Sequence, residues 1–182
     1  MNNEDNPWTT LATSLRYDNP WICVEQHDVL NPAGNPGIYG TVSFKNRAVG
    51  IVPLAENGDT WLVGQYRYPL QQYHWEIPMG GAPYDEEPQQ CALRELREET
   101  GLQADVLEPL CHLHLSNSIT NEEAFAFVAR GLQQGDTEFE ETEVIQVRRL
   151  PFSEALAMAL RGDITDAISV AALQRVRLLG LA

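Results

Sequence analysis

The sequence predicts an α+β fold in which a mixed β-sheet packs against helices. Short runs rich in β-branched and aromatic residues alternate with segments rich in glycine, proline and asparagine, as strands alternate with turns. One strong helical pattern lies in the middle of the chain, and two further helical patterns close it. The length of 182 residues suits one ordinary domain. We expect a core domain over residues 45–182 and a small antiparallel β segment over residues 1–44.

The composition limits the classes of partner. The net charge of -14 repels the phosphates of nucleic acids, so we expect no DNA or RNA partner. The three cysteines are scattered without metal-ligand spacing, which indicates reduced thiols and a cytoplasmic location. The chain begins with no basic or apolar leader, and no apolar run approaches the ~20 residues of a membrane span. We therefore expect no membrane attachment.

The first half of the chain consists mainly of predicted strands. Residues 1–15 are polar and carry no clear period, so we expect them to be mobile. The tetrapeptide ENGD at 56–59 stands between two apolar runs, a composition typical of a β-hairpin. Strands are expected at residues 21–30, 38–44, 48–54, 60–68 and 75–79, the last of them leading into the central helix.

The second half carries further strands and two helices. Residues 131–143 are rich in acidic side chains and predict a loop. Ser153 is expected to cap a helix that runs to about residue 161, and Asp166 to open the final helix. Strands are expected at residues 106–115, 124–129 and 144–149. His112 and His114 alternate along one of these strands, and we expect them to be structural, without an acidic or cysteine partner.

The central helix, which should end at Gly101, concentrates negative charge. Glu95, Glu98 and Glu99 follow the spacing i, i+3, i+4, so their carboxylates converge within one helical turn. Like charges held this close repel one another, and a divalent cation among them would relieve the repulsion. The alternative is a solvated helix face with an ion pair between Arg94 and Glu98.

The segment around this helix carries a complete sequence signature. It follows the pattern G-x5-E-x7-R-E-U-x-E-E-x-G-U, in which U is a bulky aliphatic residue, with no position missed. Its fixed points are Gly80, Glu86, Arg94, Glu95, Leu96, Glu98, Glu99, Gly101 and Leu102. Chance would produce this coincidence in fewer than roughly one in 10⁸ starts. The segment resembles the Nudix box, which implies the Nudix fold, a mixed sheet between helices.

The resemblance assigns roles within the box. Glu95, Glu98 and Glu99 match the metal-binding glutamates of the family. Met79 matches the residue whose backbone carbonyl is also a ligand, and Mg²⁺ is the expected ion, with Mn²⁺ as a substitute. Glu86 and Arg94 are expected to form a salt bridge that fixes the loop on the helix.

Segments outside the box resemble the branch that hydrolyses ADP-ribose and nucleoside diphosphate sugars. The motifs QYRYPL at 65–70 and WEIPMGG at 75–81 are similar to that branch. Arg67 is a candidate phosphate or ribose contact, and Glu76 a candidate hydrogen-bond partner of substrate, although both also fit purely structural roles. Trp21 and Tyr68 are candidates for stacking on the base, each with a core or interface position as the alternative.

One residue pair departs from that branch. Many ADP-ribose enzymes have a proline about fifteen residues beyond the box, where this chain has Asn117 and Ser118. The departure leaves room for sugars other than ribose.

The resemblance also implies a general base outside the box. In this branch the base is a glutamate on the loop before the last strand. Glu141 matches that position, and an alignment slip of one or two residues would move the assignment to Glu140 or Glu143.

We therefore expect metal-dependent hydrolysis of ADP-ribose or another nucleoside diphosphate sugar to a nucleoside monophosphate and a sugar phosphate. The alternatives are a Nudix hydrolase of dinucleoside polyphosphates or nucleoside triphosphates, and a non-catalytic nucleotide-sensing module. The expected partners are a small nucleotide substrate and, through residues 1–44, a second copy of the chain in a homodimer.

Overall fold

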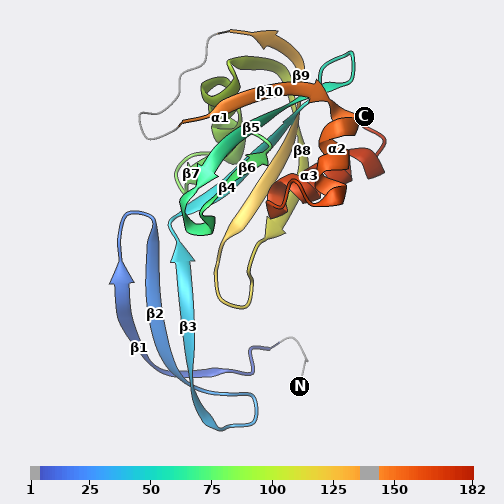
Figure 1. The fold of residues 1–182 in the computed structure, drawn as a ribbon. Coiled ribbons are helices and arrows are strands. Elements are labelled where there is room, and N and C mark those ends of the chain that lie inside the picture. The colour runs from blue at the N-terminus through green and yellow to red at the C-terminus, as the bar shows by residue number, and fades with distance from the viewer. Residues whose placement is uncertain (1–4, 136–143) are drawn as a thin grey trace. The chain divides into compact units, whose positions relative to one another are not determined.

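The computed structural model describes residues 5–135 and 144–182 (Figure 1). The chain divides into two compact units, one made of residues 1–46 and 114–122 and the other of residues 47–113 and 123–182. Across the described residues, no helix is both long and apolar enough to pass through a membrane.

The first unit contains a three-stranded antiparallel sheet in the order β1-β2-β3. Its strands are β1 (Thr9–Asp18), β2 (Ile22–Leu30) and β3 (Pro36–Phe44). The strands expected at 21–30 and 38–44 are confirmed as β2 and β3. The expectation that residues 1–15 are mobile was wrong for residues 9–15, which belong to β1, whereas residues 1–4 lie outside the described residues. Strand β1 is held in place by its pairing with β2, and the polar composition of these residues does not reveal that a partner strand exists.

The second unit contains two sheets. One has the order β7-β4-β9-β8 and the other the order β10-β5-β6. Strands β4 and β9 are parallel, whereas β5 pairs antiparallel with both of its neighbours. The strands are β4 (Asn46–Pro53), β5 (Asp59–Arg67), β6 (Gln72–Glu76), β7 (Met79–Pro83), β8 (Leu102–His114), β9 (Glu123–Gln134) and β10 (Gln146–Pro151).

The predicted hairpin at ENGD was wrong. The turn is present, but β4 and β5 lie in different sheets. Both strands are buried over most of their length, so each is a central strand with its own partners. The strand expected at 75–79 is also interrupted, because β6 ends at Glu76 and β7 begins at Met79. Pro78, which has no N–H to donate, lies in the break.

The predicted helices are confirmed with one correction. Helix α1 (Pro88–Thr100) ends at Gly101, whose φ of 72° is the left-handed conformation expected there. Helix α3 (Ala167–Leu178) begins at Asp166, whose Oδ2 accepts the Ser169 N–H at 2.7 Å. Ser153 is not a cap: it lies inside α2 (Phe152–Arg161), which begins after Pro151.

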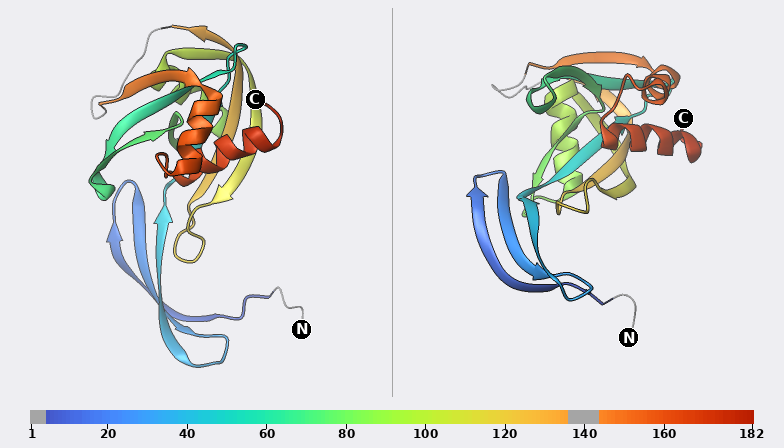
Figure 2. Two further views of the ribbon diagram at one scale, coloured as in Figure 1. Left: turned by 45° about the vertical axis from the view of Figure 1, so that its right-hand side comes forward. Right: turned by 60° about the horizontal axis from the view of Figure 1, so that its bottom comes forward.

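Helices cover both faces of the mixed sheet. Val49 and Ile51 of β4 share a buried cluster with Leu96 of α1. Gly50 lies between them, and the side of its backbone that would carry a side chain faces the opposite way. A Cβ built there would lie 2.9 Å from Ile168 of α3. Figures 1 and 2 show α1 on one side of the sheet and α2 with α3 on the other. The predicted α+β fold is confirmed.

Candidate active site

The glutamates of α1 approach the backbone of β7. Glu99 is only 2% exposed, and its Oε2 accepts the N–H of Met79 at 2.8 Å. Glu95 lies directly over Gly80, where an added Cβ would come within 2.0 Å of the Glu95 carboxyl carbon. A glycine is therefore needed at position 80 for this approach. The structure thus brings the predicted ligands Met79, Glu95 and Glu99 together, and Glu98 lies on the same helix.

Arg94 joins the loop before α1 to the acidic face of the helix. Its Nε and Nη2 bond the two carboxylate oxygens of Glu86 at 3.1 and 3.0 Å. Its Nη1 bonds Glu95 at 2.6 Å and Glu98 at 3.0 Å. Hydrogen bonding to Glu86 raises the pKa of Arg94, and the same bond lowers the pKa of the Glu86 carboxyl. One guanidinium thus offsets the repulsion among three carboxylates.

Cys91 lies under this cluster but is not a reactive thiol. Its Sγ accepts a hydrogen bond from Arg94 Nη2 at 3.4 Å, and the residue is fully buried. Burial raises the pKa of the Cys91 thiol to about 12. The nucleophilic thiolate is therefore scarce at neutral pH.

A second ion pair connects β5 and β6. Arg67 Nε lies 3.0 and 3.1 Å from the two carboxylate oxygens of Glu76, and Nη2 bonds the same group. Glu76 is buried, and its hydrogen bond raises the pKa of Arg67. Glu76 is thus already engaged by Arg67, the other residue expected to contact substrate. Within the described part of the chain, Nε and Nη2 of Arg67 donate to Glu76, and Nη1 makes no hydrogen bond with that residue.

This ion pair lines a cavity of about 210 Å³. The other polar residues of its wall are His74, Thr165 and Asp166. His74 Nδ1 lies 3.4 Å from Thr165 Oγ1. None of these wall residues was predicted from the sequence to belong to the site. They are far apart in the chain, and only Asp166 carried a signal, that of a helix cap.

A buried serine supports the backbone between Glu76, the partner of Arg67, and Met79, which Glu99 contacts. Ser169 Oγ accepts the N–H of Ile77 at 3.0 Å, in the break between β6 and β7. Glu76 precedes Ile77, and Met79 follows it by two residues. Helix α3 therefore holds the segment that presents both the Arg67 partner and the predicted carbonyl ligand. This contact was not predicted, because 92 residues separate its partners in the sequence.

The remaining candidates are dispersed. Trp21 belongs to the first unit and is 66% exposed, and Tyr68, in a short 3₁₀ turn after β5, is 81% exposed. Neither is a core residue. The three candidates for the general base, Glu140, Glu141 and Glu143, lie outside the described residues.

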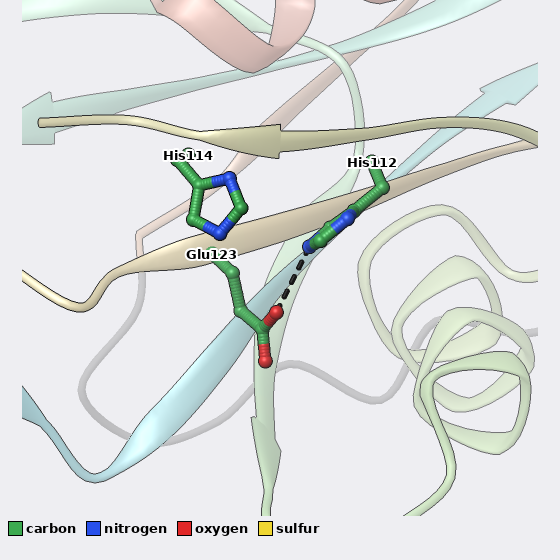
Figure 3. Close-up of side chains that lie close together, drawn as sticks. All are labelled: His112, His114 and Glu123. Carbon is green, nitrogen blue, oxygen red and sulfur yellow. Dashed lines mark hydrogen bonds and ion pairs between the residues drawn. The ribbon is translucent and has the colours of Figure 1, made fainter. Parts of the chain in front are cut away.

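The expectation that His112 has no acidic partner was wrong. His112 Nε2 lies 2.8 Å from Glu123 Oε2 (Figure 3). The two residues become neighbours because β8 and β9 are adjacent in the sheet, and strand order is not readable from local sequence.

Replacing Glu86 by glutamine should destabilise the protein in a pH-dependent way. The folded-state pKa of Glu86 is lowered, so its contribution is present above the unfolded pKa of about 4.3 and is lost as the pH falls through the lowered value. Because both partners are partly exposed, we expect Glu86→Gln to lower the free energy of unfolding by about 1 kcal/mol at neutral pH. Urea unfolding at neutral and at acid pH measures the difference.

The neighbouring substitution Glu87→Gln is the control, because Glu87 makes no side-chain capping bond. Its effect should be small at both pH values. A Glu86→Gln defect that persists undiminished in acid would contradict the assignment of this energy to the Glu86–Arg94 ion pair.

Comparison with known proteins agrees with this geometry. Residues 44–173 match the family model described as NUDIX domain, and residues 8–42 match the nucleoside diphosphate sugar hydrolase N-terminal domain. An ADP-ribose pyrophosphatase of Bacillus subtilis (strain 168) is 32% identical over 171 residues, which cover 93% of this chain and 92% of that protein. A GDP-mannose pyrophosphatase of Yersinia enterocolitica is 33% identical over 135 residues, 69% of this chain and 70% of that protein.

A solved structure described as an ADP compounds hydrolase superimposes with a TM-score of 0.85 at 26% identity. The superposition covers 96% of both chains. The family model alone spans well over half of the sequence and contains the whole glutamate helix. The chain therefore belongs to the Nudix family.

Proposed function

We propose that this protein hydrolyses the pyrophosphate bond of ADP-ribose or another nucleoside diphosphate sugar, yielding a nucleoside monophosphate and a sugar phosphate. The observation that carries the proposal is the approach of the α1 glutamates to the β7 backbone at Met79 and Gly80. Family membership supports hydrolysis, and the names of the two relatives, an ADP-ribose pyrophosphatase and a GDP-mannose pyrophosphatase, support the nucleotide-sugar class.

The donor set suits Mg²⁺. The side chains of Glu95, Glu98 and Glu99 and the carbonyl of Met79 offer only oxygen atoms, which Mg²⁺ prefers together with water and substrate phosphates. The bond from Met79 to Glu99 and the close approach of Glu95 to Gly80 hold two of the carboxylates in place. When bound, Mg²⁺ or Mn²⁺ supplies charge neutralisation for the phosphates and activation of water.

The chain's own residues divide the remaining work. Arg94 orients Glu95 and Glu98 through the hydrogen bonds of its Nη1. Arg67, oriented by Glu76, offers guanidinium hydrogen bonds to a phosphate or ribose oxygen. Ser169 holds the Ile77 backbone between these two groups. Trp21 and Tyr68, both exposed, are the proposed stacking partners of the base.

Among the Nudix activities, hydrolysis of nucleotide sugars is favoured over hydrolysis of dinucleoside polyphosphates or nucleoside triphosphates. The match of residues 8–42 to the N-terminal domain of nucleoside diphosphate sugar hydrolases supports this choice. A non-catalytic sensor would not require all three box carboxylates to be present. The three cysteines are free thiols, which supports the cytoplasm as the compartment.

A substrate panel with Mg²⁺ tests the proposal. ADP-ribose, GDP-mannose, a dinucleoside polyphosphate and a nucleoside triphosphate should be compared by kcat/KM. We expect a nucleotide sugar to give the highest value and excess chelator to abolish turnover. Preferential turnover of a triphosphate would move the protein to another Nudix activity, and full activity in chelator would overturn the metal-dependent mechanism.

Glu98→Gln should lower kcat by on the order of 10²-fold or more, because a lost metal ligand removes several kcal/mol of charge stabilisation. Its thermal stability should stay close to wild type. Glu108→Gln is the matched control, because Glu108 is exposed on β8 and pairs only loosely with Arg130 at 3.5 Å.

Glu141 is the proposed general base. Glu141→Gln should lower kcat by ~10²–10⁴-fold while metal and substrate still bind, because general-base catalysis contributes about that factor. Steady-state kinetics together with substrate binding measured calorimetrically separate the two effects. If the kcat of Glu141→Gln stays near that of wild type while Glu140→Gln or Glu143→Gln loses activity, the base is the residue whose replacement removes activity.

The sheet of the first unit is the proposed surface for homodimer formation. Among its described residues only Val29 is buried, and Leu11, Leu15, Tyr17 and Ile38 are each more than half exposed. A three-stranded sheet without its own core needs a partner surface. Light scattering at micromolar concentration should show a dimer.

Leu11→Lys with Leu15→Lys should shift the protein toward monomer, because charge would be buried in the interface. Thr10→Lys is the control on the same strand, since Thr10 is already exposed and polar. A wild-type monomer would contradict the proposal.

A further inference from the structure

A group of side chains outside the box has the composition of a transition-metal site. His112 of β8 and Glu123 of β9 are joined by the 2.8 Å contact from Nε2 to Oε2. His114, two residues further along β8, projects from the same side of the strand, because side chains alternate along β structure. The ligand atoms of the three residues all lie within 4.8 Å of one another (Figure 3).

From this arrangement we propose a second metal site, for Zn²⁺, formed by His112, His114 and Glu123. Two imidazoles and one carboxylate are a ligand set that Zn²⁺ accepts, with water completing a tetrahedron. Such a site binds Mg²⁺ poorly, because Mg²⁺ prefers oxygen ligands to imidazole nitrogen. The site therefore differs in chemistry from the carboxylate cluster on α1, and its existence does not depend on the proposed hydrolase activity.

The local structure prepares this site without closing it. In a tetrahedral site, bonds of about 2.0–2.1 Å from Zn²⁺ to nitrogen or oxygen place the ligand atoms about 3.4 Å apart. The ligand atoms here lie within 4.8 Å of one another. The two histidines are exposed, so small side-chain rotations can cover the remaining difference. The ring of His112 stacks on Phe125, with centroids 4.5 Å apart and planes 13° from parallel. That stacking restrains one ligand ring before any ion binds.

Bound Zn²⁺ would clamp the end of β8 to the start of β9. These strand ends are joined by the connection at residues 115–122. An ion that binds the folded protein and not the unfolded chain stabilises the fold by mass action, so Zn²⁺ should raise the melting temperature. Because imidazole coordinates only when neutral, binding should weaken as the pH falls below neutrality.

Calorimetric titration of the full-length protein with Zn²⁺, in buffer containing excess Mg²⁺, tests the proposal. His112→Ala and His114→Ala should each weaken Zn²⁺ binding at least tenfold, and each should abolish the rise in melting temperature. Glu98→Gln, in the α1 cluster, should retain the site. His27→Gln is the histidine control, because the His27 ring nitrogens lie 2.9 and 3.0 Å from the hydroxyls of Thr13 and Thr41.

Circular dichroism would verify that the variants fold, and the exposed positions of both histidines make this the expected result. Activity with Mg²⁺ alone should equal that of wild type. Co²⁺ provides an independent readout, since its visible absorption should report tetrahedral coordination in wild type and not in the double variant His112→Ala with His114→Ala. Equal Zn²⁺ affinity and stoichiometry in wild type and this double variant would overturn the proposal, as would the absence of Zn²⁺ binding to wild type.

Discussion

The active-site region depends on the placement of one guanidinium among carboxylates. The chain carries a net charge of -14, and three of its glutamates lie at i, i+3 and i+4 on α1. Arg94 bonds Glu86, Glu95 and Glu98 at the same time, and its planar fork allows two parallel bonds to Glu86. A lysine ammonium would supply the charge without this geometry. Arg94 therefore both lowers the electrostatic cost of the helix face and fixes the preceding loop on it.

The backbone that faces this helix is held from the opposite side of the sheet. Helix α1 packs on one face and α3 on the other, yet Ser169 of α3 bonds the Ile77 N–H next to the start of β7. Glu99 of α1 bonds the Met79 N–H two residues later. The short break between β6 and β7 is thus tied to helices on both faces. This explains why a segment without regular structure can present groups in a defined arrangement.

Local signals in the sequence were sufficient to predict where α1 ends and where α3 begins. Gly101 and Asp166 end and begin helices by chemistry confined to a few residues, and both were predicted correctly. The errors share a different cause. The pairing that orders β1, the separation of β4 from β5, and the contacts of Ser169 and His112 all depend on which distant segments become neighbours. Residue composition near each position carries little information about that choice.

The parallel pairing of β4 with β9 has a consequence for folding. Ala48 pairs with Ala124, so a stretch of chain that includes α1 and β7 must be enclosed before this pair forms. Contacts between residues so far apart form slowly, because the entropy of closing the loop is lost before the contact is gained. Helix α1 can form early from its own signals, whereas its glutamates face a completed β7 only after the sheet has closed. During refolding, helical structure should therefore appear before the capacity to bind metal.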